Sequence, residues 1–234
     1  MKHFTPSMIA LAAFFLLNNP ARSEEKAVDL FNGKDTAGWK FKGDSKRSKW
    51  VVGSVSLDPA NPARFAVEPA SGGDSAKGVL INASTGVDLY SEEVFGDCKV
   101  ELEFMVPRGS NSGVYLMGEY EVQILDSFGK QKVGPGDVGG LYGAAAPRSN
   151  AAKAPGQWQK FVIDFQAPKF EEGKKVANAR FRKVTLNGQV IHEDVEMKGP
   201  TPSGLSGKES PRGPLLFQGD HGPVAFRNIR VTPR

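Results

Sequence analysis

The stretch KVELEFMV, residues 99–106, decides the fold, because apolar and polar side chains alternate along it. Successive side chains of a β-strand point to opposite faces of a sheet. The alternation therefore predicts a strand whose inward side chains are Val100, Leu102, Phe104 and Val106. The acids between them, Glu101 and Glu103, are predicted to face solvent.

The same pattern recurs in other segments of the chain. Residues 159–166 place Phe161, Ile163 and Phe165 on one side, and residues 224–231 alternate in the same way. In residues 184–191, Asn187 and Gly188 separate two runs rich in β-branched residues. This predicts a hairpin, because a type I′ turn needs positive φ at both central positions. With 27 glycines and 16 prolines breaking the chain into short runs, the sequence predicts an all-β domain built as an antiparallel two-sheet sandwich.

We expect one such domain, spanning residues 28–234, with no linker inside it. Three segments rich in turn-forming residues, 58–78, 135–155 and 198–213, are predicted to be surface loops.

Composition and the N-terminus indicate where the protein acts. The charge of +4 is spread along a chain of 234 residues, so we expect no nucleic-acid partner. Residues 1–23 have the three parts of a signal peptide, with cleavage predicted after Ser23. No later segment is apolar enough for a transmembrane helix, so the mature protein is predicted to be periplasmic or secreted, without stable membrane insertion. Cys98, the one cysteine, neither forms an intrachain disulfide nor follows the signal as a lipid-anchor site, and it is predicted to be a buried packing residue.

Function is indicated by SNSGVYLMGEYEVQILDS, residues 110–127. If Tyr120, Val122 and Ile124 pack between the sheets, the polar residues between them line the opposite face. That row contains two carboxylates and an amide, and closely spaced carboxylates are used to cleave glycosidic bonds. The members of the row are Glu119, Glu121 and Gln123.

His221 is a second candidate, because it lies in a glycine-flanked turn just before the last predicted strand, and histidine exchanges protons near neutral pH. The chain has no zinc signature, phosphate-binding loop, dinucleotide fingerprint or nucleophile elbow. No cofactor is therefore predicted, although calcium at an acidic loop stays open without a motif to support it.

The order of several blocks resembles the 3-keto-disaccharide hydrolase family, also known as a domain of unknown function, DUF1080. The blocks are LFNGKDTAGWK, GSNSGVYLMGEYEVQILDSFG, LYGAAAP, PGQWQKFVI, LNGQVI and PLLFQGDHGPVAFRNIRV. The resemblance covers about residues 29–231 and implies a jelly-roll sandwich like that of concanavalin A-type lectins and glucanases. The chain departs from the family where Met117, Gly118 and Glu119 replace basic residues, which ranks Glu119 below Glu121.

The resemblance implies a small carbohydrate substrate whose C3 hydroxyl has been oxidised to a ketone. Such a ketone acidifies the C2 proton, so a base can start elimination of the C1 substituent, and water then adds to the enone. Glu121 and His221 are the predicted proton-transfer pair, with acid and base unassigned. The predicted substrate-binding residues are Asn111, Ser112, Glu119, Gln123, Asp126, Tyr142 and Gln218.

Two alternatives stay open at this point. Glu119 and Glu121 would instead carry out direct displacement at the glycosidic carbon. A carbohydrate-binding module without catalysis would use the same sandwich, since one fold serves lectins and enzymes alike.

Overall fold

The computed structural model describes residue 1 and residues 26–69 and 78–234. Within these residues the chain forms β-strands and one short 3-10 helix, η1 (Ser45–Arg47). The strands pair antiparallel in two main sheets, which confirms the predicted all-β sandwich. Residues 2–23 of the predicted signal peptide lie outside the described part. Within the described residues, no helix is long and apolar enough to cross a membrane.

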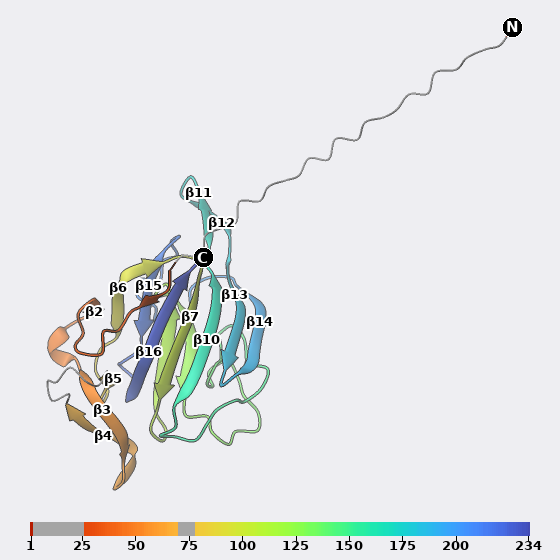
Figure 1. Ribbon diagram of the computed structural model, residues 1–234. Coiled ribbons are helices and arrows are strands. Elements are labelled where there is room, and N and C mark those ends of the chain that lie inside the picture. Colours follow the sequence, from red (N-terminus) through yellow and green to blue (C-terminus); the bar gives the residue numbers. More distant parts are fainter. Residues whose placement is uncertain (2–25, 70–77) are drawn as a thin grey trace.

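The larger sheet contains nine strands among the described residues (Figure 1). Its order is β14 (Gln189–Met197), β13 (Ala179–Leu186), β10 (Gln159–Gln166), β7 (Cys98–Met105), β16 (Val224–Pro233), β5 (Val79–Asn82), β3 (Trp50–Asp58) and β4 (Asn61–Pro69), with β1 (Val28–Asp29) paired to β16.

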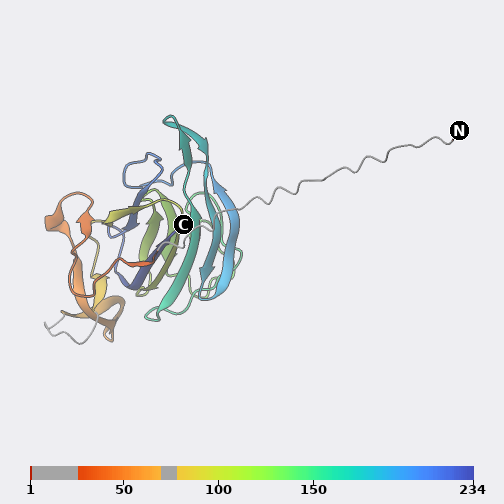
Figure 2. The same ribbon diagram turned by 45° about the horizontal axis from the view of Figure 1, so that its top comes forward.

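The smaller sheet has the order β2 (Trp39–Phe41), β6 (Leu89–Phe95), β15 (Gly213–Phe217), β8 (Asn111–Leu116) and β9 (Tyr120–Leu125). A separate hairpin, β11 (Lys169–Glu171) with β12 (Lys174–Ala177), projects away from both sheets (Figures 1 and 2).

Aromatic rings fill the space between the two sheets. Phe217 of β15 stacks on Phe226 of β16 with ring centroids 4.0 Å apart, and Trp39 of β2 stacks on Phe217 at 5.1 Å. Tyr120 of β9 meets Phe165 of β10 at 5.4 Å. Such ring pairs stabilise the core beyond the area they bury. The inner face of the smaller sheet therefore packs against the larger sheet, and its outer face takes no part in this core.

The predicted strands are present with the predicted parity. All four inward side chains of residues 99–106 are buried, as are Phe161, Ile163 and Phe165. Asn187 and Gly188 have φ of 53° and 84° between β13 and β14, which confirms the hairpin turn. Cys98 is buried as predicted, and burial raises the pKa of its thiol to about 12.

One loop prediction is wrong in part, because residues 61–69 form strand β4 instead of a surface loop. β4 pairs with β3 alone and ends the described strand order of the larger sheet. An edge strand tolerates proline, since one side of it needs no ladder donor. Pro62 therefore does not exclude a strand here, although it suggested a loop in the sequence.

Neither of the segments 135–155 and 198–212 contributes a strand to the sheets, as predicted. Both segments border β9, the last strand of the smaller sheet. Gly140 and Gly139 exchange backbone hydrogen bonds with Gln123, and the amide of Thr201 donates to the carbonyl of Glu119. These contacts cover an edge that would otherwise be open and shelter the outer face beside it.

Candidate active site

The candidate site lies on the outer face of the smaller sheet, over β8 and β9. Tyr115 stands opposite Glu121, and Gly113 stands opposite Gln123 in the antiparallel register. Directly opposed residues point to the same side of a sheet, so these four residues share one face. Tyr120, Val122 and Ile124 point to the other side and are buried in the core, as predicted.

Glu121 is the central titratable group of this face. Its side chain is 2% exposed, and it forms no ion pair within the described residues. Burial raises the pKa of Glu121 to about 7, while a hydrogen bond from Tyr115 and the positive charge of His221 act in the opposite direction. The negative charges of Asp88 and Asp220 raise this pKa further. A carboxyl group with such a pKa gains and loses a proton near neutral pH.

Gly113 makes room for the Glu121 carboxyl group. A Cβ atom at position 113 would lie 2.2 Å from Glu121 Oε1 and 3.0 Å from its Cδ. Any other side chain here would displace the carboxyl group, which gives a physical reason for glycine after Asn111 and Ser112.

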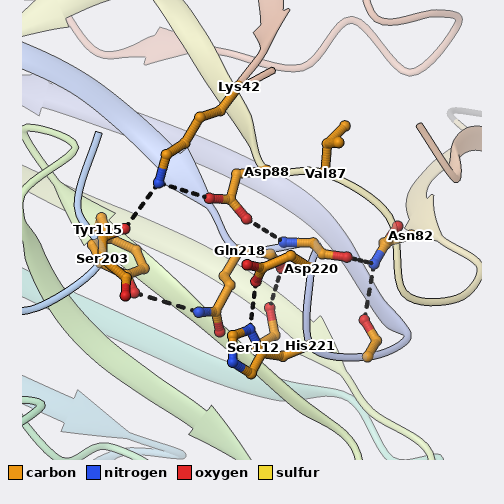
Figure 3. Close-up of polar contacts among 12 residues, drawn as sticks. Lys42, Asn82, Val87, Asp88, Ser112, Tyr115, Ser203, Gln218, Asp220 and His221 are labelled. Carbon is orange, nitrogen blue, oxygen red and sulfur yellow. Dashed lines mark hydrogen bonds and ion pairs between the residues drawn. The ribbon is translucent and has the colours of Figure 1, made fainter. Parts of the chain in front are cut away.

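Tyr115 connects Glu121 to Gln218. The Tyr115 side chain is almost fully buried, and its pKa is raised by burial and by the neighbouring Glu121 charge. The phenol therefore stays protonated and serves as a hydrogen-bond donor. Gln218 Nε2 lies 3.5 Å from the Tyr115 hydroxyl oxygen, at the long limit for a hydrogen bond (Figure 3).

Three predicted substrate-binding residues have an unsatisfied buried acceptor. The side-chain oxygens of Asn111, Gln123 and Gln218 have no hydrogen-bond partner within the described residues. Gln123 uses its Nε2 to donate to the Gly136 carbonyl at 3.2 Å. Buried polar atoms are almost always paired in folded proteins, so these oxygens, like those of Asn82 and Asp164, have a free capacity to accept a hydrogen bond.

His221 lies at the rim of this site. It is exposed on the turn after β15, and its Nδ1 is paired with the carboxylate of Asp220 (Figure 3). Its charge affects the pKa of Glu121, so the fold brings the two predicted proton-transfer residues near each other from segments about a hundred positions apart.

The remaining predicted site residues have other contacts. Ser112 donates to the Gln218 carbonyl at 2.7 Å, and Asp126 accepts from the Gly109 amide at 2.9 Å. Both contacts hold backbone in place. Tyr142 is partly exposed, and its amide donates to the Glu121 carbonyl at 3.2 Å. The role of these three residues in binding substrate stays a prediction.

Glu119 does not join Glu121 in an open row of acids. It is buried, and its carboxylate accepts hydrogen bonds from the Ser206 amide and hydroxyl, both at 2.7 Å, and from the Gly207 amide at 2.9 Å. These bonds occupy both oxygens with the 198–212 segment. The contacts favour a structural role for Glu119, in line with its lower rank from the sequence.

Sequence reasoning missed the group of polar residues on the other side of the site. Asp88, just before β6, is 6% exposed and pairs with Lys42 at 3.3 Å. Asn82, at the end of β5, donates to the carbonyls of Gly219 and Gly222. Figure 3 shows Asp88 and Asn82 each bonded to the turn that carries Gln218 and His221. No motif distinguishes them in the sequence, because they lie in three separate segments.

The described residues contain no group of three or more His, Cys, Asp or Glu side chains suited to hold a metal ion. The calcium alternative therefore gains no support from the side-chain arrangement in this part of the chain.

Comparison with solved structures finds candidate glycosyl hydrolases that share this fold. A crystal structure of a candidate glycosyl hydrolase from Parabacteroides distasonis is 26% identical with a TM-score of 0.65, covering 89% of this chain and 84% of that chain. A second candidate glycosyl hydrolase from that organism shares the fold, with 18% identity, a TM-score of 0.57, and coverage of 89% and 94%.

A search of curated proteins found no match. The model of one protein family matches residues 26–232, which include every strand of both sheets except the last residue of β16. By that match, the chain belongs to the family of 3-keto-alpha-glucoside-1,2-lyase-like domains.

Proposed function

We propose that this protein cleaves the glycosidic bond of a sugar whose C3 hydroxyl has been oxidised to a ketone. The family match and the 26% identical candidate hydrolase support a glycoside hydrolase-like or lyase-like role. The single observation that carries the proposal is Glu121, a buried carboxyl group with a pKa of about 7. It lies beside a protonated phenol and unsatisfied amide oxygens.

The ketone determines the chemistry. It acidifies the hydrogen on C2, because the electron pair left behind is delocalised onto the ketone oxygen. When a base removes that proton, the C1–O bond breaks and the alcohol leaves, which produces an enone with a C1–C2 double bond. Addition of water then places hydroxyl on C1 and hydrogen on C2, and the sum is hydrolysis.

In this reaction Glu121 takes the C2 proton in its ionised form and returns a proton to C2 during hydration. At neutral pH a group with a pKa near 7 is present in both forms, which suits a residue that acts first as base and then as acid. Tyr115 stabilises the carboxylate by its hydrogen bond. His221, at the rim, supplies the proton for the leaving alcohol. The amide side chains hold sugar hydroxyl groups.

Direct displacement by two carboxylates is less well supported. It needs a second free carboxylate beside Glu121, and the Glu119 carboxylate is occupied by Ser206 and Gly207. The elimination route needs a single buried base and therefore fits the contacts of Glu121 better.

The decisive experiment incubates the purified protein with 3-keto-trehalose or 3-keto-sucrose in heavy water. We expect release of a 3-keto sugar that carries deuterium at C2. Free 3-keto-glucose with the enzyme serves as control for exchange after release. Cleavage without deuterium at C2 supports displacement. Binding of the sugars with no cleavage indicates a lectin and contradicts the proposal.

We also propose that the protein is exported, on the basis of residues 1–23 alone. Expression with and without these residues, followed by cell fractionation and mass measurement, tests this. An intact N-terminus on cytoplasmic protein would contradict it.

A further inference from the structure

Asp88 is a buried carboxylate in contact with two segments that border the site. Its Oδ1 accepts a hydrogen bond from the Gly219 amide at 3.0 Å, and its Oδ2 lies 3.3 Å from Lys42 Nζ. Burying a carboxylate is costly unless it is paired and hydrogen-bonded. Both of its oxygens have partners, one on the turn of residues 218–222 and the other on the side chain of Lys42, just after β2 (Figure 3).

Lys42 connects this carboxylate to the 198–212 segment. Its Nζ also donates to the carbonyls of Ser203 and Gly204, each at 3.0 Å. Because all three acceptors are within the protein, Lys42 is engaged and does not offer a free cation to a ligand. The Lys42 and Asp88 pair thus joins the 198–212 segment, which also binds the Glu119 carboxylate, to the turn that carries His221.

The turn of residues 218–222 is held at several points. Asn82 Nδ2 donates to the carbonyl of Gly219 at 2.9 Å and to that of Gly222 at 2.8 Å. Gly219 lies so close to Val87, just before β6, that a Cβ at position 219 would be 2.2 Å from the Val87 carbonyl oxygen. Asp88 is the charged residue among these contacts. It anchors Gly219, which lies between Gln218 and Asp220.

We propose that Asp88 is a positioning residue, which holds the Gln218–His221 turn over Glu121 and is itself held by Lys42. This inference rests on the proposed function of the site for its catalytic consequence. Asp88 does not contact Glu121 in a hydrogen bond, so it acts through the turn and through its charge.

The charge of Asp88 affects the pKa of Glu121, which a purely structural role would leave unchanged. The groups that affect the ionisation of Glu121 are Tyr115 on β8, Asp88 before β6, and Asp220 and His221 on the turn. Asp88 disfavours the ionised form. Its removal should therefore lower the pKa of Glu121 and move the acidic limb of the pH–rate profile to lower pH.

The test compares Asp88→Ala and Asp88→Asn. Asparagine keeps an acceptor for the Gly219 amide but loses the charge, so it separates the two effects. For Asp88→Ala we expect a changed ring resonance for His221, a lower Glu121 pKa by carboxyl NMR, and a kcat at least 10-fold lower. For Asp88→Asn we expect the lower pKa with the His221 resonance close to wild type.

The chain offers matched controls. Lys40 of β2 and Glu92 of β6 form an exposed pair at 3.4 Å, so Glu92→Gln should leave both resonances and kcat unchanged. The buried His192 resonance reports that each variant is folded.

An unchanged His221 resonance and an unchanged Glu121 pKa in folded Asp88→Ala would overturn the inference. If Asp88→Ala does not fold, an unchanged Glu121 pKa in Asp88→Asn overturns it instead. If the wild-type protein cleaves no 3-keto sugar, the proposed function fails, while the two NMR measurements still decide whether Asp88 positions the turn.

Discussion

Two strands carry glutamates in the same alternating pattern, but the two sets lie in opposite environments. On β7, Glu101 and Glu103 point out from the larger sheet and are partly exposed, with Lys99 3.0 Å from Glu101 and Arg227 2.7 Å from Glu103. On β9, Glu121 points out from the smaller sheet and is buried without an ion pair in the described residues.

The ionisation of the two sets follows these surroundings. A hydrogen bond from Lys99 holds the pKa of Glu101 below its ordinary value. For Glu103, burial acts to raise the pKa, but hydrogen bonds from Arg227 and Asn228 outweigh it and lower the pKa. Burial raises the pKa of Glu121 to about 7. Alternation along the strand thus determines which face a glutamate lies on. Whether that face is covered determines whether the glutamate forms a solvated ion pair or has a pKa suited to proton transfer.

The largest expected effect is on turnover in Glu121→Gln. Glutamine keeps the size of the side chain but cannot take a proton, so we expect kcat on a 3-keto glycoside to fall about 10³-fold, as for the loss of a general base. In the wild type, kcat should fall as the pH drops below about 7, because only ionised Glu121 accepts the C2 proton.

The matched variant Glu101→Gln should change kcat less than twofold. A Glu121→Gln enzyme with wild-type kcat would remove Glu121 from the proposed mechanism.

The next effect is on stability, and here the same substitution is favourable. Glu121 has a folded pKa raised from 4.5 to about 7, so the stability available below pH 4.5 is lost as the pH rises through 7. At ~1.4 kcal/mol per pKa unit, the loss is about 3 kcal/mol.

We therefore expect Glu121→Gln to have a free energy of unfolding up to about 3 kcal/mol higher than wild type at pH 8.5, measured by urea unfolding. At pH 4.5 we expect little difference. Equal urea midpoints at both pH values would show that the Glu121 carboxylate is not buried in the folded protein.

A smaller effect is expected for Gly113→Ala. The new methyl group would lie 2.2 Å from Glu121 Oε1 and must push the carboxyl group aside. Misplacement of a reacting group by about 1 Å costs up to ~10²-fold, so we expect kcat to fall roughly 10- to 100-fold with the fold retained.

Gly199→Ala is the control for Gly113→Ala, because a Cβ at position 199 meets no atom within 4 Å. Circular dichroism and kcat measured on both variants complete the comparison. Wild-type turnover in Gly113→Ala would mean that the position of the carboxyl group does not limit the reaction.

The smallest effect is expected for Glu103→Gln. It weakens a partly exposed ion pair with Arg227, whose guanidinium also lies 4.0 Å from the Trp158 ring centroid. Partly exposed pairs contribute about 1 kcal/mol or less. Urea unfolding at pH 8.5 should show this small destabilisation, opposite in sign to Glu121→Gln. A destabilisation of several kcal/mol would contradict the solvated environment assigned to β7.

The difference between these regions also separates what could be predicted from what could not. The strands, the Asn187-Gly188 turn and the parity of β7 and β9 follow from local patterns, and each agrees with the structure. The sequence predicted that Glu119, Glu121 and Gln123 line one outward face, with Glu119 ranked below Glu121. In the structure, Glu121 is sheltered and Glu119 is bonded to Ser206 and Gly207.

Strand β4 and the Lys42–Asp88 pair could not be read from the sequence. Pro62 is compatible with a strand here because β4 lies at an edge. Asp88 belongs to no motif, and its partners are Lys42, just after β2, and Gly219, in the turn after β15.

By itself, the sequence determined that the chain forms an antiparallel β-sandwich and which side chains point to each face. A strand's two-residue period and a turn's φ angles are local properties, so a few neighbouring residues suffice. Only the tertiary structure decided which outward carboxylate becomes buried and near which histidine it lies. Gly113, Thr201 and Tyr142, which lie far apart in the sequence, all contact Glu121 in the folded chain. The pKa of Glu121 depends on its burial and on the charges of His221, Asp88 and Asp220, which the fold brings near it.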